Sequence, residues 1–134
     1  MTQNEKDILL KDLCARLPYG VKVQIKNEIV VLDSICDDDG YHFNFIGDDR
    51  EGVNIENIKP YLFPLSSMTE EQKQEYTYIV NYISSDDTEN WKEGEFIYVE
   101  QFTQLMHFYH INHLDYMGLI PMGLANDATG LNIY

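Results

Sequence analysis

The stretch VKVQIKNEIVVLDSICDDDGYHFNFIG, residues 21–47, decides the fold class. In residues 21–26, valine or isoleucine at every second position alternates with lysine or glutamine, which is the period of a strand with one buried face. The run EIVVLDSI that follows is apolar and rich in β-branched side chains, and it predicts a central strand. Residues 41–45 alternate again, with aromatic rings at 41, 43 and 45. The stretch therefore predicts three strands.

The connections between these strands are short and polar. KNE, CDDDG and GDDREG are rich in the residues that turns require, and EGVNIENI, residues 51–58, predicts a further short strand. Four or five short strands within about 40 residues indicate a curled antiparallel meander or a small SH3-like barrel. The pattern leaves open whether the strands close into a barrel.

An amphipathic helix is predicted before this stretch. Thr2 and Glu5 have the spacing of a capping box, and Pro18 and Gly20 stop the helix. The apolar positions recur at helical spacing: Ile8, Leu9, Leu13 and Leu17, with Cys14 beside them. Cys14 and also Cys36, which follows the apolar run, are predicted to be reduced core residues.

The second half of the chain predicts two helices after an extended link between Pro60 and Pro64. Thr69 and Gln72 form a second capping-box pattern, and an apolar stripe follows at Tyr76, Ile79, Val80 and Ile83. A polar loop is expected over residues 84–95, around Trp91. The last helix is expected from about Tyr98 to His113, with Phe102, Leu105, Met106 and Tyr109 facing inward.

The tail, residues 117–134, holds glycines and a proline that prevent one long helix. It is expected to pack as short turns over the core through Leu119, Ile120, Met122 and Leu124. The whole chain is thus predicted to be a single α+β domain, residues 1–134, in which residues 1–64 supply a helix and the β part and residues 65–134 are mainly helical.

The charge is strongly acidic, with nine basic and 23 acidic residues and a net charge of −14. Residues 1–27 carry five basic and three acidic residues, so the remainder carries −16. Such a surface disfavours direct binding to nucleic acid and to anionic membranes. The chain has no run of 18 apolar residues, and no signal peptide and a cytoplasmic location are expected.

The histidines of HFYHINHLDY, residues 107–116, are the most conspicuous candidates for chemistry. His107, His110 and His113 advance by three, so on a helix they fan over about 120°, unlike the i, i+4 pair of H-E-x-x-H metal sites. With Gly40 at the sixth position of a calcium-binding EF-hand loop, Ile35 and Ile46 occupy the first and twelfth positions, where acids are required. No nucleophile elbow, phosphate loop or dinucleotide fingerprint is present. Structural histidines, no cofactor and no enzymatic activity are therefore expected.

Two segments, IKPYLFPLSSMTEEQKQEY (58–76) and NHLDYMGLIPMGLA (112–125), resemble a family of short, uncharacterised proteins from prophages and other mobile elements of gut bacteria. The match includes Lys59 to Leu62, Pro64 to Glu71, His113, Asp115, Tyr116, Gly118 to Ile120 and Gly123 to Ala125. Members often carry arginine where this chain has Met117. The resemblance implies an accessory role and no specific mechanism.

Three hypotheses about function follow. The first is a non-enzymatic protein-binding module, because no catalytic motif is present and a small β half commonly offers a peptide groove. Its candidate interaction site is His113, Asp115 and Tyr116. The second is an acidic DNA mimic that inhibits a nucleic-acid-binding protein. The third is a metal-dependent enzyme that uses the cluster from His107 to His113. The expected partner is another protein.

Overall fold

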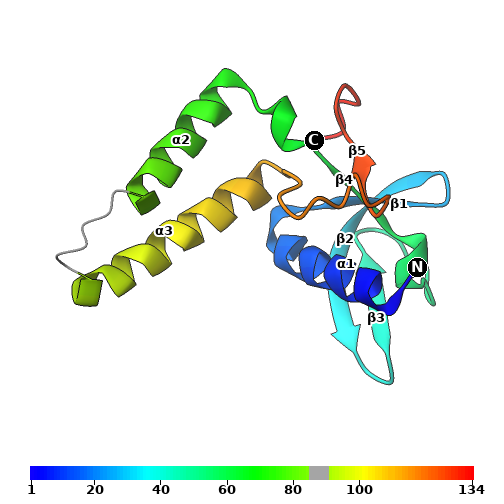
Figure 1. The fold of residues 1–134 in the computed structure, drawn as a ribbon. Coiled ribbons are helices and arrows are strands. Elements are labelled where there is room, and N and C mark those ends of the chain that lie inside the picture. Colours follow the sequence, from blue (N-terminus) through cyan, green and yellow to red (C-terminus); the bar gives the residue numbers. More distant parts are fainter. Residues whose placement is uncertain (85–90) are drawn as a thin grey trace.

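The computed structural model describes residues 1–84 and 91–134 (Figure 1), and the side chains of residues 1–81 and 100–134. Its helices are α1 (Gln3–Arg16), α2 (Glu70–Ser84) and α3 (Trp91–Ile111), with short 3₁₀ turns η1 (Leu17–Tyr19), η2 (Ile55–Asn57) and η3 (Leu65–Ser67). Its strands are β1 (Lys22–Ile25), β2 (Glu28–Asp37), β3 (Tyr41–Phe45), β4 (Lys59–Leu62) and β5 (Asn126–Asp127).

The five strands form one sheet in the order β3-β2-β1-β4-β5. The pairs β1–β2, β2–β3 and β1–β4 are antiparallel, whereas β4 and β5 run parallel. In the part of the chain that the structure describes, β3 and β5 have one strand neighbour each, so the sheet is open. The predicted α+β fold is confirmed, and of the two predicted forms the structure has the open sheet.

One predicted strand is wrong. Residues 51–58 form no strand, and the 3₁₀ turn η2 lies there, held by hydrogen bonds from Asn57 N to Asn54 O and from Ile58 N to Ile55 O. Val53 and Ile55 are two residues apart, as in a strand, but Ile58 follows three residues after Ile55. A spacing of three is the period of a 3₁₀ turn. The fourth strand, β4, lies instead in the segment that was predicted to be an extended link.

Helix α1 covers the sheet and buries its apolar stripe there. Leu9 and Leu13 are fully buried and belong to one cluster with Val23, Leu32 and Phe43. The capping box at the start of this helix is present, with both of its hydrogen bonds. The tail completes the same core through buried residues, namely Leu119, Leu124 and Ala125. Met122, which was predicted to pack inward, is exposed, because it lies on the outside of the turn between Leu119 and Leu124.

The two cysteines do not lie in the core as predicted, and both are exposed. On α1, Cys14 follows the buried Leu13 and is rotated about 100° away from it, which places the thiol beside the apolar stripe rather than within it. On β2, Cys36 pairs with the exposed His42 near the turn of the β2–β3 hairpin.

Helices α2 and α3 lie side by side and extend away from the sheet (Figure 1). The capping box of α2 is confirmed, since Thr69 Oγ1 accepts from Gln72 N and Gln72 Oε1 accepts from Thr69 N. Between the helices, Tyr76 and Ile79 of α2 pack with Phe108 and Tyr109 of α3 in a second apolar cluster.

The predicted limits of the last helix are wrong at both ends. Helix α3 begins at Trp91, so residues 91–95 of the predicted loop are helical, while residues 85–90 of that loop lie outside the described residues. It ends at Ile111, and His113 has a φ of +53°, which no α-helix accommodates. Phe102 is 52% exposed and Phe108 is buried instead, because α2 covers only a narrow stripe of α3.

Candidate functional site

The residues that the sequence singled out lie at a junction where the end of α3 meets α1 and β4. Phe63, just after β4, donates from its N to His113 O and accepts on its O from Asp115 N, each over 2.8 Å. These two hydrogen bonds join the segment after α3 to the residue that follows β4, near the middle of the chain.

A buried ion pair on α1 lies next to this junction. Arg16 and Asp12 have no exposed side-chain surface, and Arg16 Nε donates to Asp12 Oδ2 over 2.7 Å. The Arg16 guanidinium also lies 5.3 Å from the centre of the Tyr116 ring. Burial raises the pKa of the Asp12 carboxyl, and this effect outweighs the opposing effects of Arg16. The i, i+4 spacing of an acid and a base was the only sequence signal for this pair.

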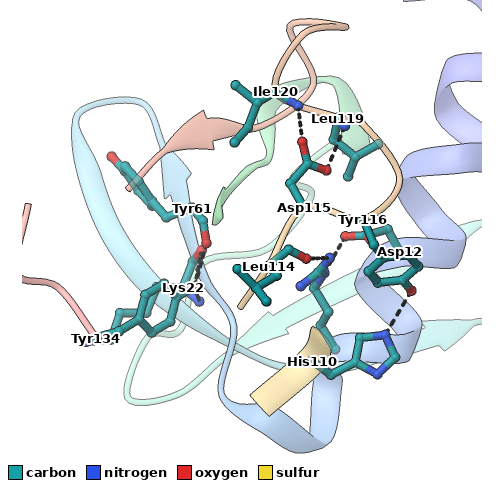
Figure 2. Close-up of polar contacts among 11 residues, drawn as sticks. Asp12, Lys22, Tyr61, His110, Leu114, Asp115, Tyr116, Leu119, Ile120 and Tyr134 are labelled. Carbon is teal, nitrogen blue, oxygen red and sulfur yellow. Dashed lines mark hydrogen bonds and ion pairs between the residues drawn. The ribbon is translucent and has the colours of Figure 1, made fainter. Parts of the chain in front are cut away.

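Asp115 organises the turn that follows the junction. Figure 2 shows its carboxylate directed at the backbone of Leu119 and Ile120. Oδ1 accepts from Leu119 N over 2.8 Å and Oδ2 accepts from Ile120 N over 2.9 Å. Because Asp115 is buried, the two hydrogen bonds replace the water that the carboxylate loses. The side chain thus fixes the first turn of the tail.

The histidines of α3 contact tyrosines. His110 Nε2 lies 2.8 Å from the hydroxyl of Tyr116 (Figure 2), and His107 Nδ1 lies 3.0 Å from the hydroxyl of Tyr19. Burial, reinforced by the nearby Arg16 and His107, lowers the pKa of His110 to about 4. Among the side chains that the structure describes, no group of three His, Cys, Asp or Glu residues could hold a metal ion.

His113 points in another direction, toward the last residue of the chain. Its ring stacks on Tyr134 with the ring centres 3.6 Å apart, and burial is the main cause that lowers its pKa to about 4. The Tyr134 hydroxyl accepts from Lys22 N over 2.9 Å and donates to Tyr61 O over 2.8 Å (Figure 2). All three candidate residues, His113, Asp115 and Tyr116, thus make contacts within the chain that hold the junction together.

A second candidate site lies along the edge strand β3. The sequence suggested a peptide groove in the β half but did not indicate which residues form it. After β3 the chain turns at residues 46–47, and Asp48 forms a single bridge with Phe45. The chain then diverges from β3, and a hollow of about 660 Å³ separates residues 39–44 from residues 51–54. This hollow, here named the β3 slot, has the volume of a typical ligand site, about 300–1,000 Å³.

The charges around the β3 slot are mainly negative. Asp39 and Glu51 line it, and both are exposed. The nearest cations are already paired: Lys6 lies 2.7 Å from Glu56, and Arg50 binds Asp48 and Glu28. These contacts lower the pKa of Glu56 and of Asp48. Among the described ion pairs none involves Asp39 or Glu51, so the slot presents unneutralised acid.

Comparison of the chain with protein-family models, with curated proteins and with solved structures finds no match. Of the helices in the described residues, none is both long and apolar enough to cross a membrane.

Proposed function

We propose that this protein is a non-enzymatic accessory protein of a mobile element and acts by binding another protein through the β3 slot. The observation that carries the proposal is the hollow beside an edge strand that has a single strand neighbour among the described residues. The unpaired backbone groups of an edge strand are a ready template for another chain. The resemblance of residues 58–76 and 112–125 to mobile-element proteins supports the accessory role.

The slot is better suited to a protein segment than to a compact small molecule. Its lining is more polar than apolar, with Asp39, His42, Asn44 and Asn54 among its residues. Small-molecule sites are concave and mostly apolar. Peptides that lie along a sheet edge obtain much of their affinity from main-chain hydrogen bonds.

The test is affinity capture from a host lysate with the full chain and two matched variants. Asn54→Trp fills the slot from an exposed position that makes no described side-chain hydrogen bond, while Gln74→Trp adds the same ring to an exposed face of α2. We expect a specific partner with the wild type and with Gln74→Trp, and its loss with Asn54→Trp. The proposal is contradicted if no specific partner is recovered and the protein is found to catalyse a reaction.

The same experiment tests the DNA-mimic hypothesis. A mimic competes with nucleic acid over a broad acidic surface. Its partner would therefore be a nucleic-acid-binding protein that added duplex DNA displaces, and Asn54→Trp would leave the capture unchanged. That outcome would show that the partner binds the broad acidic surface and not the β3 slot.

A further inference from the structure

We infer that the β3 slot takes an extended, basic segment of another protein, which pairs with β3 as an additional strand. This inference rests on the proposed function and names the class of partner that the slot recognises. It depends on three features of the slot: its position relative to β3, its charge, and a neighbouring hollow that could take a side chain.

The position follows from the residues that line the slot. Successive side chains of a strand point to opposite faces, so a hollow on one face is lined by every second residue. The β3 slot is lined by the consecutive residues 39–44. It therefore runs along the edge of the strand, where the backbone N–H and C=O groups that do not face β2 are directed.

The divergence of the chain after Asp48 makes room for a strand. The bridge between Phe45 and Asp48 begins a pairing on the outer edge of β3, and it is the only one described there. Beyond this bridge, residues 51–54 do not pair with β3, and the slot lies between them and the strand. A segment of about five residues, which spans about 16 Å when extended, matches the length of β3.

The charge of the slot selects a basic segment. Asp39 and Glu51 face it without an ion-pair partner among the described residues, and Asp37 and Asp38 lie exposed at the adjoining hairpin end. Lysine or arginine side chains on the incoming strand would neutralise these acids. A second copy of the chain is disfavoured, because each copy has a net charge of −14 and the same acids would meet.

A neighbouring hollow of about 330 Å³ adds a place for one side chain, with apolar residues on part of its lining. It shares Tyr41, Phe43 and Asn54 with the slot, and it is also lined by Ile55 and by the paired Lys6 and Glu56. Tyr41 and Phe43 are two residues apart and therefore point to the same face of β3. Strand-adding peptides commonly place alternate side chains in such pockets, so the expected segment alternates basic and apolar residues.

The test uses purified full-length protein and three fluorescent ten-residue peptides. The first alternates lysine with valine, and the second replaces each lysine with glutamate. The third has the first sequence with N-methyl groups on two adjacent central residues, which block both edges because successive N–H groups point to opposite sides. Fluorescence anisotropy measures affinity, and hydrogen exchange locates the amides that become protected.

Matched variants separate local charge from the net charge of the protein. Asp39→Asn with Glu51→Gln removes both slot acids and keeps their shapes, and asparagine tolerates the φ of +51° at position 39. Glu71→Gln with Glu75→Gln makes the same charge change on an exposed face of α2. The first pair is expected to weaken binding about threefold to tenfold, and the second by less than about twofold.

Support for strand addition is saturable binding of the lysine peptide, with affinity at least about tenfold lower for the N-methylated peptide and slower exchange in residues 41–45. Equal binding of the methylated or glutamate peptide, protection elsewhere, or no saturation by about 1 mM overturns it. A dimer with protected residues 41–45 in the absence of peptide also overturns it and assigns the slot to a second copy. If Asn54→Trp still abolishes capture of the partner from the lysate, the proposed function stands even when the peptide experiment contradicts strand addition.

Discussion

The Nη2 atom of Arg16 donates a hydrogen bond to the backbone oxygen of Leu114 over 2.7 Å, across 98 positions of sequence. The bond joins the last turn of α1 to the segment that leaves α3, and the guanidinium also pairs with Asp12. Since Arg16 is fully buried, water cannot replace either partner. Arg16 is therefore a buried polar link between the first helix and the second half of the chain.

We predict that Arg16→Met lowers the free energy of unfolding by about 3–5 kcal/mol, because Asp12 would remain buried without its partner. Urea unfolding followed by circular dichroism measures the change. Adding Asp12→Leu to this variant should restore most of the stability, since apolar residues of similar volume often replace a buried ion pair without loss. Lys11→Met, on an exposed position of α1, is the control. A loss no larger than that of the control would contradict this role of Arg16.

Asp115→Ala is expected to destabilise the protein by about 2 kcal/mol or more, because the backbone N–H groups of Leu119 and Ile120 lose their acceptors. Asp115→Asn retains one side-chain oxygen and should lie between the wild type and the alanine variant. Urea unfolding again gives the comparison. Asp33→Ala removes an exposed aspartate from β2 and serves as the control. If all three variants unfold at the same urea concentration, Asp115 does not fix the turn.

Both cysteines should react with a thiol reagent in the native protein, because both are exposed. Partial burial raises the pKa of the Cys14 thiol, so its reaction should accelerate strongly as the pH rises above neutrality, where the thiolate forms. Mass spectrometry of the labelled protein counts the modified sites. The variant Cys14→Ser should accept a single label, on Cys36. Labelling that appears only after denaturation would show that the thiols are buried.

Local patterns predicted much of the fold. The period of two in residues 21–26 and 41–45 predicted β1 and β3, and the spacing of Thr69 and Gln72 predicted the start of α2. These signals succeed because the period of a strand and the cap of a helix involve residues close together in sequence. The apolar face of α1 was predicted for the same reason, through Leu9 and Leu13.

The parts that were not predicted depend on distant segments. Strand β5 has only two residues and exists because residues 126–127 lie beside β4, and so short a strand shows no period. Asp12 and Arg16 look like an exposed helical pair until the segment around Leu114 packs over them. The β3 slot likewise depends on the path of residues 48–54 after one bridge, and turn-forming residues do not determine that path.

We predict that stability decreases as the pH falls from about 6.5 to about 4. The pKa values of His110 and His113 are both lowered from 6.5 to about 4, mainly by burial. Over this interval the unfolded chain binds protons while the folded protein keeps both rings neutral, so acid favours unfolding. The loss should be complete below pH 4, where both states are protonated. Asp12, whose pKa is raised, acts in the opposite sense, because its folded form binds a proton first as the pH falls.

The contribution of His110 is isolated by comparing the wild type with His110→Gln, which keeps a polar group near the Tyr116 hydroxyl but does not titrate. Urea unfolding at half-unit steps from pH 7.5 to about 3.5 gives the free energy of unfolding of each protein. The difference between the two curves should change between about pH 6.5 and 4 and stay constant outside that window, because only there do the folded and unfolded states of His110 differ in protonation. His42→Gln, at an exposed position on β3, controls for the loss of a histidine as such. Parallel curves for the wild type and His110→Gln would mean that the His110 ring gains its proton equally well in the folded protein, and that the junction does not exclude water from it.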